Sequence, residues 1–138
     1  MTDRKVLEDI VTSFYEARAA SDKAKLLSFA APDFSFCIVA SGKLAPMGQR
    51  VCEPALLDAT VDNLLADWDM TNIKTTRLYI DDDTVFAHRA GTIRYNPRDK
   101  EVETEFIDRF TIKDGRIVDM TEFVDTLMIA ETVGLVDA

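Results

Sequence analysis

The sequence predicts an α+β fold, in which helices cover one face of a curved sheet. In the first half of the chain, most apolar residues recur at the spacing of an amphipathic helix. After Asn72 they alternate with polar residues instead, as they do in β-strands. Helices followed by an antiparallel meander are typical of α+β proteins. Because the chain has 138 residues, we expect residues 1–138 to form a single domain.

Three helices are expected in the first half. The first spans residues 3–20, where apolar side chains form one stripe. The second spans residues 21–29 and is stopped by Pro32. The third begins at Pro54, which suits the first turn of a helix, and ends near Trp68.

Period-two segments predict the strands. The expected strands are residues 34–39, 73–80, 84–95, 102–112 and 117–124. Residues 40–53 contain Gly42, Pro46 and Gly48 and are expected to form a loop at a pocket mouth. The tail after Asp125 is expected to form a closing helical turn.

Composition excludes several classes of function. A net charge of −9 argues against nucleic-acid binding, which needs a basic patch. No apolar stretch reaches transmembrane length and no signal peptide is evident, so we expect a cytoplasmic protein without membrane contact. Cys37 and Cys52 form no close-spaced motif, and one histidine cannot build a metal site of several imidazoles. We therefore expect neither a metal nor a cofactor.

One carboxylate interrupts the apolar face of the strand at residues 102–112. Its even positions are apolar except for Thr104 and Asp108, whereas its odd positions are mostly charged. An unpaired buried charge is unfavourable, so Asp108 must be partnered, protonated or open to a cavity. We expect this strand to line a ligand pocket.

Turn chemistry predicts the partners of Asp108. A type I turn at Asn96-Pro97 places Arg89 directly opposite Asp108. At Asp114-Gly115, a bulged three-residue loop places Asp108 opposite Met120 and turns Glu122 inward. A two-residue turn would bring Thr121 inward instead, and we prefer the bulge because the even face of this strand is more apolar.

The Arg89, Asp108 and Glu122 trio has two interpretations. It is either an ion-pair network that fixes sheet register or a site for acid-base chemistry. If Arg89 touches Asp108, the carboxylate stays ionised and can act as a base. If Arg89 turns away, burial leaves Asp108 as a neutral donor.

Eight apolar and aromatic side chains are candidate ligand contacts. They are Phe14, Tyr15, Phe36, Cys37, Trp68, Phe106, Phe110 and Met120. The single histidine, His88, is expected on the outward face of its strand.

The segment F-I-D-R-F-T-I-K-D-G-R-I-V-D-M-T-E-F-V-D and the order of the elements carry a family resemblance. The chain resembles the nuclear transport factor two-like superfamily, which includes SnoaL-like cyclases, ketosteroid isomerases and limonene epoxide hydrolases. The resemblance implies a cone-shaped fold, with a strongly bent mixed or antiparallel sheet wrapped around three N-terminal helices. It also implies a deep apolar pocket between the sheet and the helices, and commonly a homodimer.

The resemblance implies roles for individual residues. Asp108 matches the protonated aspartate of ketosteroid isomerases, whereas Phe14 and Cys37 stand at the positions of that family's tyrosine and base. Arg89 and Glu122 resemble the arginine and one carboxylate of limonene epoxide hydrolases. The pocket aspartate of SnoaL-like cyclases is best matched by Asp108.

We therefore expect a protein that binds a small hydrophobic molecule and performs acid-base chemistry of an isomerase, cyclase or hydrolase type. Asp108 would be the acid-base group, with Arg89 and Glu122 in support. The alternative is a non-catalytic binding or dimerisation module with a structural trio. The outward strand faces are expected to form a two-fold dimer contact through Glu103, Glu105, Arg109, Arg94 and His88.

Overall fold

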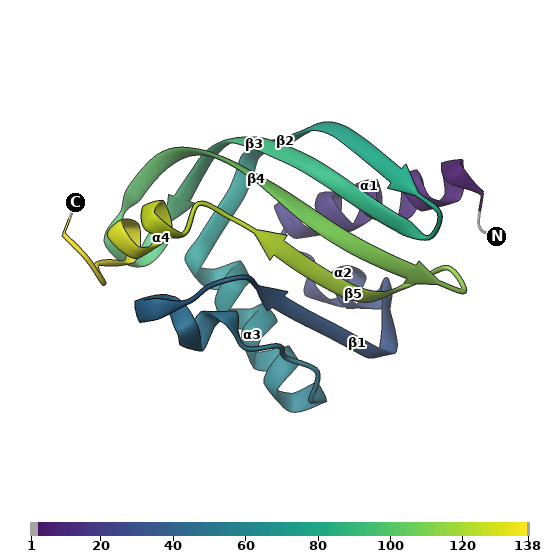
Figure 1. Cartoon of the computed structure of the whole chain (residues 1–138), viewed down its shortest axis with the longest axis horizontal. Helices are drawn as coiled ribbons and strands as arrows, with labels where there is room; N and C mark the ends of the chain where they lie inside the picture. The colour runs from purple at the N-terminus through teal and green to yellow at the C-terminus, as the bar shows by residue number, and fades with distance from the viewer. Residues whose placement is uncertain (1–2, 138) are drawn as a thin grey trace.

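The structure, a computed structural model, describes residues 3–137. Helices and strands are mixed along the chain, and the five strands form one open sheet in the order β1-β5-β4-β3-β2 (Figure 1). The elements in chain order are α1 Arg4–Ala19, α2 Lys23–Ser28, β1 Ala30–Ile38, η1 Gly42–Gly48, α3 Pro54–Asp67, β2 Trp68–Asp81, β3 Thr84–Tyr95, η2 Asn96–Arg98, β4 Lys100–Lys113, β5 Arg116–Phe123 and α4 Thr126–Val133. The α+β class is confirmed.

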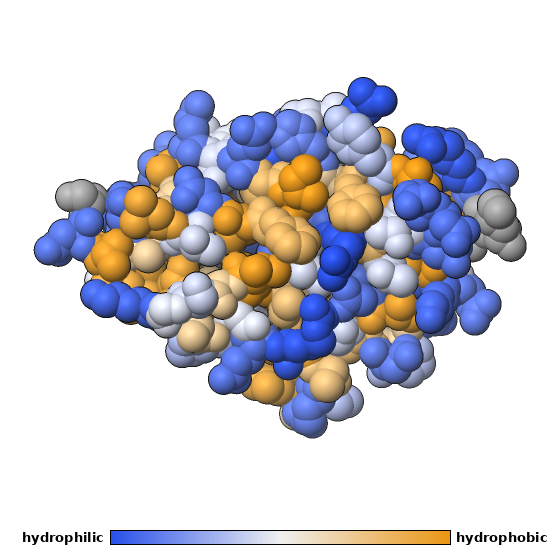
Figure 2. All heavy atoms as spheres, in the orientation of Figure 1, coloured by the Kyte–Doolittle hydropathy of each residue, from blue (hydrophilic) through white to orange (hydrophobic). Residues whose placement is uncertain are grey.

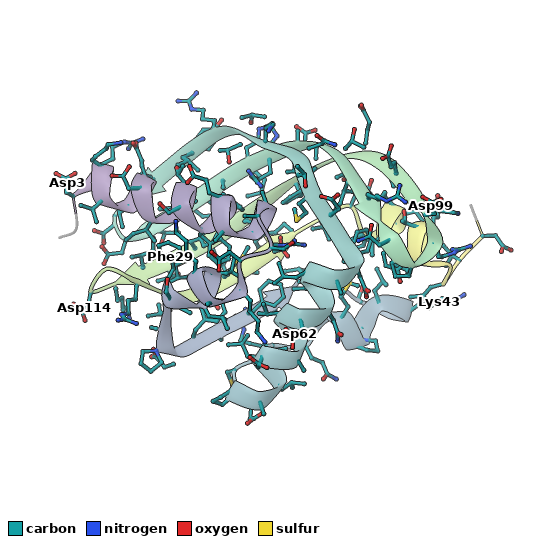
Figure 3. All side chains as sticks on the ribbon, turned by 180° about the vertical axis from the view of Figure 1, so that it is seen from behind. Asp3, Phe29, Lys43, Asp62, Asp99 and Asp114 are labelled. Atoms are coloured by element: carbon teal, nitrogen blue, oxygen red, sulfur yellow. The ribbon has the colours of Figure 1, made fainter. Side chains whose placement is uncertain are left out.

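The first three helices lie on one side of the bent sheet. Figure 3, seen from the opposite side to Figure 1, shows α1, α2 and α3 in front of the strands. The turn at Asp114 and the turn at Asp99 mark opposite ends of the sheet in this view. The main core fills the space between the two layers and includes Leu7, Val11 and Phe110. The concave face of the sheet is therefore the covered face.

Side-chain caps start the helices where the sequence predicts them. Asp3 accepts a hydrogen bond from the backbone N–H of Lys5 at the start of α1. Glu53 accepts from two backbone N–H groups at the start of α3, whose first residue is Pro54. Because these caps satisfy N–H groups that a helix leaves unpaired, they define the helix starts.

Two predicted boundaries are wrong. Pro32 lies inside β1 and does not stop α2, which has already ended at Ser28. β2 starts at Trp68, directly after α3, because its pairing with β3 tolerates an irregularity between Asp69 and Asn72. Both strands are longer than their alternating segments because edge strands accept Pro and bulges.

The pairing of β3 with β4 differs by two residues from the prediction. Arg89 lies opposite Phe106, and Ala87 lies opposite Asp108. The four-residue connection begins at Asn96, one residue earlier than expected, because Asp99 adopts a left-handed conformation with φ 53°. A shift of two residues preserves the faces, so Arg89 and Asp108 both still point inward.

The hairpin between β4 and β5 combines the two predicted alternatives. Lys113 pairs with Arg116, which leaves a two-residue turn at Asp114-Gly115. The register then shifts around Val118, between the Ile112–Ile117 and Thr111–Asp119 pairs. This bulge lies in the strand, not in the turn, and it places Glu122 opposite Asp108.

The remaining elements close the end of the sheet. α4 packs with η1 in a separate small cluster built around Leu44, Ile129 and Ala130. The expected helical turn is thus a full eight-residue helix, capped by Asp125. Within residues 3–137, no helix is long and apolar enough to cross a membrane.

Candidate functional site

A cavity lies between the helices and the concave face of the sheet. Its volume is about 130 Å³. Apolar side chains from every layer form most of its wall, among them Phe34, Phe36, Trp68, Phe106 and Met120. Few polar side chains reach it. The cavity therefore suits a small and mainly apolar molecule.

Asp108 is the most deeply buried polar side chain of this wall, with 0% exposure. It stands near the middle of β4, whose alternation turns it to the same face as Phe106 and Phe110. The Tyr15 hydroxyl donates a hydrogen bond to Asp108 Oδ2, with a distance of 2.6 Å between the oxygens. Within residues 3–137, no group donates to Asp108 Oδ1.

The surroundings of Asp108 favour its protonated form. Burial raises the pKa of Asp108 well above its usual value, and the nearby Glu122 carboxyl raises the pKa further. The hydrogen bond from Tyr15 and the charge of Arg89 lower the pKa, but they are weaker influences. Protonation of Asp108 would turn one of its two carboxyl oxygens into a hydrogen-bond donor.

Arg89 does not contact Asp108, which corrects the predicted ion pair. Its Nη1 donates to the Thr75 hydroxyl at 2.8 Å, and its guanidinium carbon lies 3.6 Å from the centre of the Tyr15 ring. The two-residue change in register places Arg89 behind this ring and outside the cavity wall. Tyr15 is therefore in contact with both ionisable groups, with Arg89 through its ring and with Asp108 through its hydroxyl.

Glu122 points inward, as predicted for the even-numbered positions of β5. It pairs with Asp108 across β4 and β5, is half-buried and lines the cavity. The Glu122 carboxyl is, after burial, the main influence that raises the pKa of Asp108. The arrangement therefore places a carboxyl group with a raised pKa beside a second carboxyl group in the cavity wall.

Arg18 is a cavity residue that the sequence reasoning missed. It comes from α1, and its Nη2 donates to the backbone oxygens of Leu64 and Trp68 at 3.1 and 2.8 Å. Burial lowers the pKa of Arg18, whereas the charge of Glu122 raises it. Residues 14, 15 and 18 share one face of a helix, so their spacing is the signal that could have found it.

Most predicted ligand contacts do line the cavity, and two do not. Phe14, Tyr15, Phe36, Trp68, Phe106 and Met120 are part of its wall. Cys37 points to the outer face of the sheet, where Arg50 Nη2 donates to its sulfur at 3.0 Å. Phe110 is fully buried behind the wall and packs edge-on against Phe14 and Tyr15.

No metal centre is apparent in the part of the chain that the structure describes. Across residues 3–137, no group of His, Cys, Asp and Glu side chains is arranged to hold an ion. His88 lies on the outer face, between Thr76 and Glu105. The ionisable side chains in the cavity wall are Tyr15, Arg18, Asp108 and Glu122.

Comparison with known sequences identifies one family. A family model described as a SnoaL-like domain matches residues 11–120. A search of curated proteins found no match. The matched region contains Tyr15, Arg18 and Asp108 but ends before Glu122.

Solved structures similar to this one share its fold. A candidate isomerase from Bacillus subtilis is 15% identical, with 97% of this chain and 96% of that chain covered and a TM-score of 0.84. TerC, co-crystallised with polyporic acid, is 16% identical, with coverages of 94% and 98% and a TM-score of 0.77. A protein with a ketosteroid isomerase-like fold from Catenulispora acidiphila, in complex with trimethylamine, is 13% identical, with coverages of 91% and 92% and a TM-score of 0.73. At these identities the similarity establishes the cone-shaped, nuclear transport factor two-like fold alone.

Proposed function

Because this chain belongs to the SnoaL-like domain family, we propose that it binds a small, mainly apolar molecule in the cavity and moves a proton on it. Asp108 is the acid-base group of this proposal, and Glu122 assists it. The reaction is a cofactor-independent isomerisation or cyclisation. Fold alone does not select this function, so the proposal depends on the geometry of the site.

One observation carries the proposal: the hydrogen bond from Tyr15 to a fully buried Asp108 in the wall of an apolar cavity. Structural carboxylates are usually neutralised by a cation in contact, whereas Asp108 has a hydroxyl donor and a second carboxyl group. A carboxyl group with a raised pKa next to a carboxylate is a common arrangement for acid-base catalysis.

The proposed step conserves protons and electrons. The Glu122 carboxylate takes a proton from the carbon between the carbonyl and the C=C bond of a β,γ-unsaturated ketone, while protonated Asp108 donates to the carbonyl oxygen. The resulting dienol then returns the oxygen proton to Asp108 and receives the carbon proton from Glu122 at the γ carbon. The double bond moves, and both carboxyl groups return to their starting states.

Tyr15 and Arg89 are positioning residues in this proposal. The Tyr15 hydroxyl fixes one oxygen of Asp108, and the other oxygen has no hydrogen-bond partner within residues 3–137. Arg89 supports the Tyr15 ring from behind. Epoxide hydrolysis of the kind that needs an arginine between two carboxylates is less well supported, since Arg89 is not in ion-pair contact with Asp108.

The test is Asp108→Asn, with exchange of carbon-bound protons as the readout. Wild-type protein in D₂O is incubated with a set of apolar ketones, including cyclohex-3-enone, and deuterium incorporation is followed by proton NMR. We expect exchange above the buffer rate, reduced by about 10²–10⁴-fold in Asp108→Asn. Asp119→Asn, on the outer face of β5, is the matched control and should exchange as wild type does. Equal rates in wild type and Asp108→Asn would refute the assignment.

A non-catalytic binding module is the second candidate function. The observation in its favour is that Arg89 and Asp108 are 4% and 0% exposed, as expected for a structural network. Under this reading no ketone exchanges above the buffer rate. Replacing Asp108 and Arg89 together by apolar residues would then preserve or increase stability.

A further inference from the structure

A polar hollow adjoins the apolar cavity. We define it by Arg18, Ser21, Asp69, Thr71 and Asn96, which line a space of about 190 Å³. Arg18, together with Leu65 and Met70, belongs to the walls of both spaces. Arg18 therefore stands at the boundary between an apolar compartment and a polar one.

The guanidinium of Arg18 keeps donors that the protein does not use. Its Nη2 is engaged by the backbone oxygens of Leu64 and Trp68. Among residues 3–137, no acceptor binds its Nε or Nη1, and no carboxylate is in ion-pair contact with it. Guanidinium N–H groups that are partly buried need acceptors, which a ligand or water can supply.

The charges around Arg18 select the kind of acceptor. Glu122 lines the cavity on one side of it, and Asp69 lines the hollow on the other. Both carboxylates favour the charged guanidinium. A ligand anion placed beside Arg18 would be repelled by both carboxylates, and a ligand cation would be repelled by Arg18 itself. An uncharged oxygen meets neither penalty and still accepts a charge-assisted hydrogen bond.

We propose that the cavity and the polar hollow form one divided site for an apolar molecule with an uncharged, oxygenated end. The apolar body occupies the cavity, a carbonyl or hydroxyl oxygen accepts from Arg18, and the oxygenated end extends into the polar hollow. The inference rests on the ligand cavity of the proposed function and adds the class of ligand. It also makes Arg18 a specificity-determining residue.

The test measures binding of three similar phenyl compounds to wild type and to Arg18→Met. The compounds are butylbenzene, 4-phenylbutan-2-one and 3-phenylpropanoate, and the signal is the fluorescence of Trp68, the only tryptophan of the chain and part of the cavity wall. We expect wild type to bind the ketone more tightly than the carboxylate. In Arg18→Met the Kd of the ketone should rise about tenfold relative to the Kd of butylbenzene.

Controls separate this effect from a loss of folding. Arg77→Met removes an arginine that stacks on Tyr79, away from the cavity, and should leave the ketone-to-butylbenzene ratio unchanged. Since Arg18 also binds the end of α3, circular dichroism checks each variant, and Arg18→Lys serves if Arg18→Met does not fold. Lys keeps the charge but offers fewer donors, so a smaller loss of ketone affinity is expected.

Two results would overturn the inference: a carboxylate that binds wild type more tightly than the ketone does, or a ratio that does not depend on Arg18. Neither result would contradict the proposed function, which is tested separately by proton exchange in Asp108→Asn. Conversely, an Arg18-dependent ratio without any proton exchange would support the divided site and contradict the catalytic role of Asp108.

Discussion

Asp108 is held by a hydroxyl where the sequence suggested a guanidinium. Tyr15 donates to one of its oxygens, while Arg89 lies on the far face of the Tyr15 ring. Of the two alternatives that the sequence left open, the structure has the one in which Arg89 turns away. With Arg89 at a distance, burial has the largest effect on the pKa of Asp108 and raises it.

Replacing Tyr15 by Phe should change both the titration of Asp108 and stability. The Tyr15 hydrogen bond lowers the pKa of Asp108, so its removal should raise that pKa further. If protonated Asp108 is the active form, the loss of proton exchange at high pH should move to higher pH. The free energy of unfolding should fall by about 1–3 kcal/mol, because Asp108 Oδ2 loses its donor. Tyr79→Phe, at an exposed tyrosine, should change neither quantity.

Asp108→Asn should stabilise the protein in a pH-dependent way. The ordinary pKa of Asp108 is 3.8, and its native pKa is higher. Between these two values the native state holds a proton that the unfolded state has released, so wild-type stability falls as pH rises. The stability difference between variant and wild type should grow by about 1.4 kcal/mol per pH unit between pH 3.8 and the native pKa, and stay constant above it.

Urea unfolding at several pH values measures this difference. Below pH 3.8 the pH-dependent part should vanish, because both states of the wild type are protonated. Asp81→Asn, at an exposed position, is the reference variant. A difference that stays constant with pH would contradict a raised native pKa.

The sequence predicted the roles of some residues in the cavity and not of others. Asp108 was identifiable because one carboxylate in an alternating apolar row demands an explanation. Arg18 was not, because an arginine near the end of an amphipathic helix is ordinary, and its cavity role depends on α3 and β2 packing beside it. Cys37 was wrong as a ligand contact because the family resemblance suggested it, whereas alternation with Phe36 turns it to the opposite face of β1.

At the scale of elements, the β4–β5 hairpin shows why register is difficult to predict. A two-residue turn and a bulge were treated as exclusive alternatives, but both occur, with the bulge at Val118. The turn alone would have put Thr121 in the cavity. The bulge reverses the alternation and returns Met120 and Glu122 to the inner face, where Met120 is buried. The apolar pattern thus predicted which face of β5 points inward, but not that a bulge inside the strand produces this orientation.

Gly91 offers a test of the bend in β3. Its φ is 142°, and a Cβ there would lie 2.2 Å from the backbone oxygen of Asn72 in β2. Gly91→Ala should therefore reduce the free energy of unfolding by about 3 kcal/mol or more. Gly115→Ala is the matched control, since its φ is also positive at 74° but nothing lies near its Cβ.

Thermal or urea unfolding of both variants gives the comparison. The control should lose about 1 kcal/mol from backbone strain alone. If Gly91→Ala and Gly115→Ala lose the same free energy of unfolding, the close approach of β2 to Gly91 does not add to the destabilisation.

At the scale of the whole molecule, the outer face of the sheet carries charged side chains and exposed aromatic rings. Figure 2 shows hydrophobic and hydrophilic groups interspersed over this face. Phe123 is 42% exposed, with the guanidinium of Arg109 over its ring, and Tyr79 is 48% exposed. Such a mixture suits a contact between two copies of the chain.

We predict a homodimer through this face. Light scattering at micromolar concentration should give twice the mass of the chain, and Phe123→Glu should reduce it to that of a monomer. Leu56→Glu, on the helical side of the molecule, should leave the dimer intact. A wild-type monomer would contradict the prediction.

The fold as a whole was more predictable than the site. The order of helices and strands follows from local patterns and caps, and the family resemblance supplied the bent sheet. The site depends on distances between α1, α3 and three strands, and a change of two residues in one register moved Arg89 out of contact with Asp108. Local patterns do not determine such distances.

The position of β1 has a consequence for the way in which this protein folds. β1 is the first strand, and within residues 3–137 the strand beside it is β5, the last one, with which it runs parallel. Pairs so distant in sequence form slowly, because a long loop must close before any contact compensates for its lost entropy. During synthesis β1 cannot pair until β5 has left the ribosome. Until then the apolar side chains of Phe34 and Phe36 remain exposed, which favours aggregation.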